Sequence, residues 1–178
     1  MQSIFMNKRF FIFAIAIILF VNTSFKTLPS KDDYYIVVDK SDYEMLVYDE
    51  DDNWQVTYPC VFGSKDLGDK MMQGDRKTPE GTFHIIAKRP HAKWNKFFAL
   101  DYPTEESIQK FNDRKARGII PQDAKIGGEI GIHGTWPHEE FAVDLFQNWT
   151  QGCVSTKNEY VKTLFTAIPV GTKVIIRK

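Results

Sequence analysis

The sequence predicts a mainly β domain, a mixed β-sandwich or barrel-like fold that carries two or so short helices. Short runs of β-branched and aromatic residues recur along most of the chain, separated by turn residues. Only two segments carry helix-capping residues or apolar residues at helical spacing. Aromatic residues make up 14% of the chain, with 14 Phe, 7 Tyr and 4 Trp, which favours a packed β-rich core over a helical bundle.

Three strands are expected in the first part of the domain. Residues 34–39 are a β-branched and aromatic run, and residues 44–48 follow the turn-forming pair Ser-Asp. Residues 54–62 alternate in part and end at Gly-Ser. The acidic cluster 49–53 is expected to be a solvated hairpin tip, because it lacks the spacing and the glycine of a calcium-binding EF-hand loop.

The middle of the chain combines a loop, two strands and a helix. Residues 65–79 are mostly polar and are expected to form a long loop, after which residues 80–87 and 97–100 have strand character. A helix is predicted over residues 104–117, since Thr104 is a good N-cap, acidic residues follow it and basic residues precede a terminating glycine.

The C-terminal part is predicted to alternate strand, helix and strand. Residues 130–132 form a short apolar run, residues 157–168 carry apolar side chains at helical spacing, and residues 173–176 follow a Pro-Val-Gly turn. No internal repeat or linker divides residues 34–178. They are therefore predicted to form one domain.

The N-terminus has the composition of a targeting segment. Lys8 and Arg9 precede an apolar run over residues 10–21, which is shorter than the roughly 20 residues needed to cross a bilayer. This pattern predicts a secretory signal peptide over residues 1–24 and a short linker over 25–33, hence a secreted or periplasmic protein. Small polar residues replace the usual Ala-x-Ala cleavage site, so an uncleaved anchor that tethers the domain to the membrane is the alternative.

Charge and cysteine content exclude several classes of protein. The chain has 23 Lys and Arg against 23 Asp and Glu, whereas nucleic-acid binders usually carry a basic excess, so no nucleic-acid partner is expected. Two cysteines cannot form a disulfide-rich scaffold or a four-thiolate zinc site. Cys60 lies within a predicted strand and is expected to be a small buried hydrophobic residue that forms no disulfide.

Cys153 and His133 are the strongest candidates for chemistry. A cysteine with an upstream histidine suggests nucleophilic catalysis, in which the imidazole takes the thiol proton and later donates it to a leaving amine. Gly152 would let an acyl substrate approach the sulfur closely. A zinc site of His133, His138 and Cys153 is disfavoured because Gly and Pro separate the two histidines, so neither a metal nor another cofactor is expected.

Two sequence blocks carry a family resemblance. His133 is followed by sixteen residues and then by Thr150-Gln-Gly-Cys153, and residues 74–83 contain Thr-Pro-Glu-Gly-Thr-Phe. Together with the closing segment 161–176, this pattern resembles the L,D-transpeptidase catalytic domain, also called YkuD, over residues 34–178. The resemblance implies the L,D-transpeptidase fold.

The resemblance also implies roles for individual residues. Cys153 would be the nucleophile and His133 the general base, with the backbone carbonyl of Gly134 orienting the imidazole. Thr150 and Gly152 would shape the turn before the nucleophile and the oxyanion site.

The chain departs from the family pattern at two positions. Gln151 replaces the usual His two residues before the nucleophile, and Ser155 replaces the usual Arg or Asn two residues after it, as in a subgroup with a Trp-Thr-x-Gly-Cys motif. An arginine there would grip a carboxylate through two hydrogen bonds, which serine cannot do. Predicted substrate contacts are Gln151, Ser155, Trp136, Trp149 and Arg76. His91 is expected to be solvated within a basic loop able to contact an anionic glycan strand.

The resemblance implies an enzyme of the bacterial cell wall. Cys153 would attack the carbonyl of the third residue of a peptidoglycan stem peptide and expel the terminal D-amino acid. An amine would then take the thioester to form a 3-3 cross-link or attach another acceptor, and a carbapenem-type β-lactam would acylate the same cysteine. An L,D-carboxypeptidase on the same site and a non-catalytic peptidoglycan-binding module are the alternatives.

Overall fold

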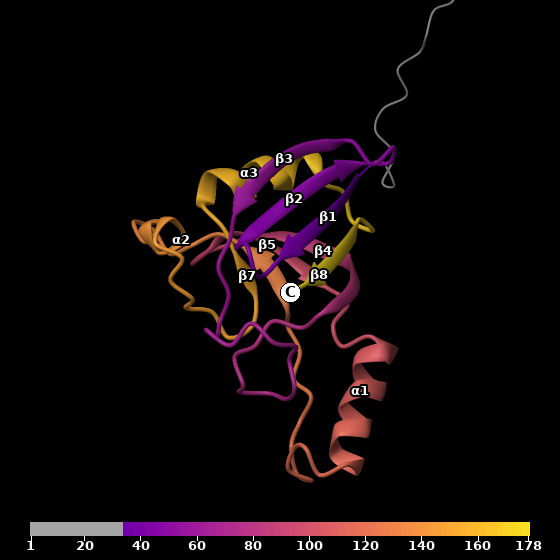
Figure 1. The fold of residues 1–178 in the computed structure, drawn as a ribbon. Helices are drawn as coiled ribbons and strands as arrows, with labels where there is room; N and C mark the ends of the chain where they lie inside the picture. The colour runs from indigo at the N-terminus through magenta and orange to yellow at the C-terminus, as the bar shows by residue number, and fades with distance from the viewer. Residues whose placement is uncertain (1–33) are drawn as a thin grey trace, which may run out of the picture.

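The computed structural model describes residues 34–178; the predicted signal peptide and linker lie outside the described residues. Eight strands and three helices follow one another along this part of the chain (Figure 1). In chain order they are β1 Tyr34–Asp39, β2 Glu44–Asp49, β3 Trp54–Pro59, β4 Gly81–His91, β5 Asn95–Leu100, α1 Glu105–Ala116, β6 Gly131–His133, α2 Phe141–Asp144, β7 Val154–Ser155, α3 Asn158–Ala167 and β8 Lys173–Arg177.

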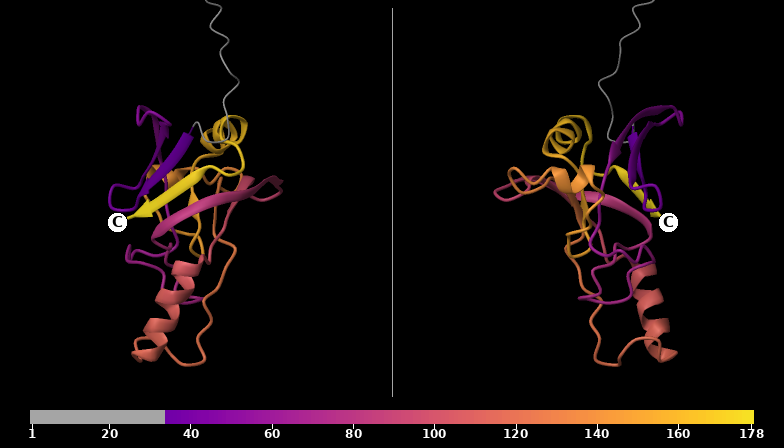
Figure 2. Two further views of the ribbon diagram at one scale, coloured as in Figure 1. Left: turned by 90° about the vertical axis from the view of Figure 1, so that its right-hand side faces the viewer. Right: turned by 60° about the vertical axis from the view of Figure 1, so that its left-hand side comes forward.

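All eight strands belong to one mixed sheet, in the order β3-β2-β1-β8-β4-β5-β6-β7. The pairs β1–β8 and β6–β7 are parallel, and the other neighbours are antiparallel. The sheet curls, and α3 packs against β5 and β6, whereas α1 and the segment after it extend away from the sheet (Figure 2). The prediction of a mainly β domain is confirmed.

The core lies inside the curled sheet, and the strand sequences account for it. The central strand β1 buries three consecutive residues, Ile36, Val37 and Val38, whereas β2 alternates and buries Met45 and Val47. Side chains of β4, β5, β6 and α3 complete the same apolar cluster. This buried apolar surface holds the sheet in the curvature that shapes the site.

Helix α1 forms where its capping residues predict it. The Thr104 hydroxyl accepts a hydrogen bond from the Ser107 amide at 3.2 Å, and acidic residues occupy the first turn. The helix buries only Phe111. Among the helices of residues 34–178, none combines the length and the apolar character needed to cross a membrane.

Several predicted boundaries are wrong. β3 ends at Pro59 rather than at residue 62, because the Cys60 amide bonds to Tyr43 and Val61 crosses to pair with Ser155. β4 continues past residue 87 to His91, where it forms a long hairpin with β5. The structure also contains the short elements α2 and β7, which the sequence did not predict.

Candidate active site

Cys153 and His133 open into the same cleft, which has a volume of about 840 Å³. β6 supplies His133 at its last residue, and the turn before β7 supplies Cys153; these two strands are parallel neighbours. The fold therefore brings the two residues together although nineteen residues separate them in the sequence. The cleft is lined by Ile86, Arg89, His91, Trp94, Phe97, Ala99, Leu100, Tyr102, Gly128, Glu129, Ile130, His133, Trp136, Trp149, Thr150, Gln151 and Cys153.

The His133 ring is fixed in one tautomer. Its Nδ1 lies 2.7 Å from the carbonyl oxygen of Gly134, and because a carbonyl only accepts, Nδ1 carries the proton and donates it. The Nε2 atom of the neutral ring is then free to accept a proton. Burial lowers the pKa of His133 to about 4, so the imidazole is neutral at physiological pH.

The Gly134 carbonyl that orients the imidazole is itself held on several sides. It accepts a second hydrogen bond from the Ser155 hydroxyl at 3.1 Å, and the Gly134 amide donates to the Trp94 carbonyl at 3.0 Å. A Cβ atom at position 134 would collide with the Asn158 side chain, so only glycine fits there. This geometry agrees with the predicted orienting role of Gly134.

The Cys153 thiol is half-buried and protonated in the free protein. Its Sγ donates to the carbonyl oxygen of Glu129 at 3.4 Å. Burial raises the pKa of Cys153 to about 11, although the Gly131 amide acts in the opposite direction. The resting site therefore holds a neutral thiol and a neutral imidazole rather than an ion pair.

Thr150 and Gly152 shape the turn that presents the nucleophile. The Thr150 hydroxyl donates to the Cys153 carbonyl at 2.8 Å and accepts from the Gly152 amide at 3.1 Å. Gly152 has φ 125°, and a Cβ atom there would lie 2.8 Å from the Lys77 carbonyl oxygen. Since the Gly152 amide is already bonded within the turn, the structure favours the turn-shaping role of this pair over an oxyanion role.

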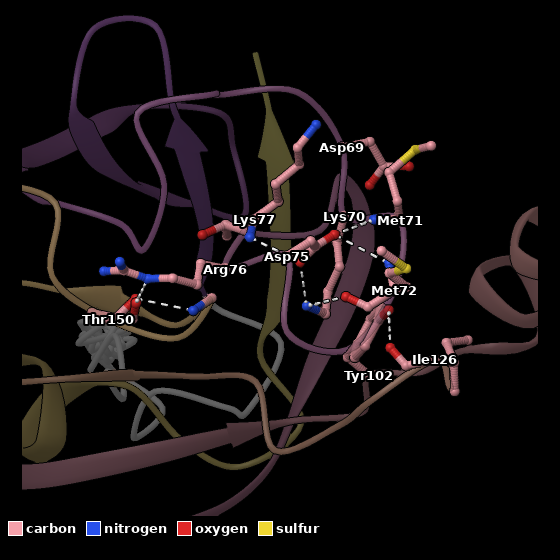
Figure 3. Close-up of polar contacts among 12 residues, drawn as sticks. Asp69, Lys70, Met71, Met72, Asp75, Arg76, Lys77, Tyr102, Ile126 and Thr150 are labelled. Atoms are coloured by element: carbon pink, nitrogen blue, oxygen red, sulfur yellow. Dashed lines mark hydrogen bonds and ion pairs between the residues drawn. The ribbon is translucent and has the colours of Figure 1, made fainter. Parts of the chain in front are cut away.

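The loop before β4 packs behind this turn. The carboxylate of Asp75 accepts hydrogen bonds from the backbone amides of Met71, Met72 and Lys77 (Figure 3). It also accepts one from the ammonium group of buried Lys70 at 2.8 Å. Burial opposes ionisation of Asp75, but these donors together hold its pKa below the usual range. Asp75 therefore fixes the loop whose Lys77 carbonyl contacts the nucleophile turn.

Arg76 lies on the outside of the same turn. Its side chain is exposed, its backbone has φ 60°, and its Nε donates to the Thr150 carbonyl at 3.3 Å (Figure 3). It does not belong to the lining of the cleft. In this arrangement the guanidinium supports the turn before Cys153, and the substrate contact of Arg76 stays a prediction.

Ser155 also differs from its predicted role. Its side chain is fully buried and points to Gly134 rather than into the cleft. The reason is the parallel pairing of β6 with β7, which sets Ser155 directly beside His133. By contrast, Gln151, Trp136 and Trp149 line the cleft, where the substrate contacts predicted for them would be possible.

A stack of aromatic rings, which the sequence did not predict, covers the His133 imidazole. The Trp94 indole lies 4.4 Å from the His133 imidazole with planes inclined by 20°, and the His91 ring stacks on Trp94 at 4.4 Å and 8°. His91 is half-buried, so the expectation of a solvated ring holds only in part, because one face of the ring stacks on Trp94. The aromatic and basic composition of residues 88–97 was the available signal, but only the β4–β5 hairpin brings them to His133.

The other candidate side chains lie away from the cleft. Cys60 is fully buried, as predicted, and both cysteines are free. His138 is exposed, and within residues 34–178 no three His, Cys, Asp or Glu side chains gather as metal ligands would.

The chain is similar to known L,D-transpeptidases over nearly all of the described residues. The model of the L,D-transpeptidase catalytic domain (YkuD) matches residues 33–176. The putative L,D-transpeptidase YqjB of Bacillus subtilis (strain 168) is 31% identical over 149 residues, which cover 83% of this chain and 73% of that protein.

Solved structures share the fold. The helical cell shape determining protein Pgp2 from Campylobacter jejuni has a TM-score of 0.58 at 24% identity, and covers 83% of this chain. The Ldtfm-avibactam carbamoyl enzyme has a TM-score of 0.54 at 20% identity, and covers 82%. This chain spans 49% of the length of each of these two chains. On the family match and the similarity to YqjB, the chain belongs to the L,D-transpeptidase catalytic domain family.

Proposed function

We propose that this protein is a cell-wall L,D-transpeptidase that acts on peptidoglycan stem peptides through a thioester on Cys153. The observation that carries the proposal is the hydrogen bond from His133 Nδ1 to the Gly134 carbonyl, which leaves Nε2 unprotonated in the same cleft as the thiol. Family membership supports the reaction type. The aromatic lining supports a sugar-peptide substrate, since such clefts combine apolar walls with a few polar groups.

In the acylation step Cys153 attacks the carbonyl carbon of the third residue of the stem. The S–C bond forms while the thiol proton passes to His133 Nε2. Collapse of the tetrahedral adduct breaks the C–N bond to the terminal D-amino acid, whose amine takes the proton back from His133. Because both groups are neutral at rest, the proton moves only when substrate is in place.

In the second step an acceptor amine attacks the thioester. His133 takes the proton from the attacking nitrogen, and the thiolate leaves and is reprotonated. The product is a 3-3 cross-link or another amide. If water attacks instead, the same site releases a tripeptide and acts as an L,D-carboxypeptidase.

The same nucleophile is expected to react with β-lactam-type acyl donors, including carbapenems. One structural neighbour is described as an avibactam carbamoyl enzyme, and its similarity here extends to the fold. The half-buried thiol at the cleft wall supports such an adduct on Cys153.

The location and the subgroup are further parts of the proposal. Residues 1–24 would direct the protein out of the cytoplasm, to the periplasm or cell wall, and an uncleaved signal would tether it to the membrane. The Trp-Thr-x-Gly-Cys motif at residues 149–153 supports assignment to a subgroup in which the residues at positions 151 and 155, here Gln151 and Ser155, differ from the usual ones.

Incubation with a disaccharide-tetrapeptide, followed by mass spectrometry, tests the proposal. The wild-type protein should give a dimer that has lost one terminal D-amino acid, whereas Cys153→Ala should give none. Cys60→Ala is the matched control, because Cys60 is a buried thiol outside the cleft, and it should retain activity. Tripeptide alone would identify a carboxypeptidase. Binding without turnover in both wild type and Cys153→Ala would identify a non-catalytic module.

A further inference from the structure

One wall of the cleft is formed by a row of residues from three neighbouring strands. Arg89 of β4 pairs with Phe97 of β5, and Phe97 pairs with His133 of β6. Directly paired residues project from the same face of a sheet, so the three side chains are neighbours. Adjacent strands lie about 4.8 Å apart, which places the Cα atom of Arg89 about 10 Å from that of His133.

The Arg89 guanidinium is held within this row. Its Cζ lies 4.9 Å from the centroid of the Phe97 ring, and Phe97 stacks beside His133 with centroids 6.0 Å apart and planes inclined by 12°. An aromatic face restrains a guanidinium while the N–H donors in its plane stay available. Arg89 is therefore a positioned cation one ring away from the general base.

No carboxylate of the described chain neutralises this cation. Among the ion pairs of residues 34–178, none includes Arg89. The other basic residues of the hairpin have different neighbours, since Lys88 caps the end of α3 and Lys93 lies over the Trp136 ring. Among the described residues that line the cleft, Arg89 is the only Lys or Arg.

The proposed donor brings carboxylates close to the attacked bond. The terminal D-amino acid ends in a free carboxylate one residue beyond the attacked carbonyl, about 3.5 Å further along an extended chain. A diaminopimelate third residue carries another carboxylate on its side chain. Ser155, which occupies the position of the family's Arg or Asn, is fully buried and cannot reach either group.

We propose that Arg89 recognises a stem-peptide carboxylate and determines the specificity of this cleft for acidic acyl donors. This inference rests on the proposed function and names the group that selects its substrate. The guanidinium would donate two parallel N–H bonds to the carboxylate, a geometry that lysine or serine cannot reproduce. The cation that recognises the substrate is thus supplied from β4.

Binding of three peptides tests the inference. The first is the parent tetrapeptide, which keeps all its carboxylates. The second has a carboxamide in place of the C-terminal carboxylate, and the third has a carboxamide in place of the carboxylate on the side chain of its third residue. Calorimetry on the Cys153→Ala protein measures recognition without turnover. The parent should bind at least about tenfold more tightly than one of the two amides, and that amide identifies the recognised carboxylate. When Arg89→Gln is added to the Cys153→Ala protein, the affinity for the parent peptide should fall to the affinity for that amide. The affinity for the amide itself should not change.

Two further variants separate specificity from folding. Arg89→Lys should retain only part of the preference, and Arg117→Gln, an exposed position at the end of α1, should retain all of it. Thermal unfolding should be unchanged in all of these variants. The inference would be overturned if the Arg89→Gln protein still bound the parent peptide more tightly than the amide by the same factor, or if no peptide bound at all. Turnover by the wild-type protein tests the proposed function separately: Arg89-dependent binding without turnover would leave this inference standing and remove the transpeptidase proposal.

Discussion

The Trp94 indole covers the His133 imidazole, with ring centroids 4.4 Å apart and planes inclined by 20°. The Trp94 carbonyl also accepts the amide of Gly134, the residue that orients the imidazole, so one residue holds the base through both its backbone and its ring. Burial by such neighbours lowers the pKa of His133. An indole face also stabilises the imidazolium that forms when His133 takes the thiol proton.

Replacing Trp94 should therefore impair the general base. Trp94→Ala is expected to lower kcat about thirtyfold, since a buried cation–π contact is worth roughly 2 kcal/mol, and to raise the pKa of His133 by admitting water. Trp94→Phe should retain much of the activity because it keeps an aromatic face. The pH dependence of kcat measures both effects, and Trp54→Ala, at an exposed site on β3, is the control. Unchanged activity in Trp94→Ala would show that the stack has no role in catalysis.

Alkylation should reveal that the resting thiol is neutral. Burial raises the pKa of Cys153 to about 11 and lowers the pKa of His133 to about 4, so thiolate is scarce at pH 7. The rate of modification of Cys153 by iodoacetamide should rise about tenfold per pH unit between pH 7 and 10. Mass spectrometry of the modified peptide measures this rate, and the fully buried Cys60 should not react in the folded protein. A fast, pH-independent reaction between pH 5 and 8 would indicate a thiolate–imidazolium pair instead.

The lowered pKa of His133 should also destabilise the fold in acid. The unfolded chain binds a proton at His133 near pH 6.5, whereas the folded chain binds it only near pH 4. The contribution of this group to stability is therefore complete above pH 6.5 and is lost as the pH falls towards 4, by about 3 kcal/mol.

Denaturant unfolding at pH 7 and at pH 4 checks this expectation. Other groups titrate in the same range, so the comparison is with His133→Gln, whose loss of stability between the two pH values should be smaller than that of the wild type by about 3 kcal/mol. Equal losses in the two proteins would mean that His133 titrates normally in the folded state.

The sequence predicted the fold class and singled out Cys153 and His133, which share one cleft, because these signals are local. Strand residues alternate or form apolar runs between turns, and Cys153 and His133 lie in short blocks of characteristic composition. α2 and β7 were missed because four and two residues are too few to show a periodicity. β4 was cut short because Lys88, Arg89 and Pro90 are unfavourable in an isolated strand, whereas pairing with β5 overrides that preference.

The supporting residues of the site depend on register, which the sequence does not display. Trp94 reaches His133 only because β4 and β5 form a hairpin that lies beside β6. The direction of the Ser155 side chain depends on the parallel pairing with β6, and a shift by one residue would turn it to the other face. For this reason Ser155 was predicted to touch the substrate, whereas its hydroxyl contacts the Gly134 carbonyl, which is also bonded to the His133 ring.

The role of Ser155 can be decided by separating kcat from KM. Ser155→Ala removes one of two hydrogen bonds to the Gly134 carbonyl, which is worth about 1 kcal/mol, so kcat should fall about fivefold while KM stays within twofold. The freed carbonyl becomes a better acceptor for His133 Nδ1–H, which should raise the pKa of His133 and move the acid limb of the kcat profile to higher pH. Ser155→Thr keeps the hydroxyl and should restore the profile. A substrate contact would behave differently, because Ser155→Ala would then raise KM and leave the acid limb where it is.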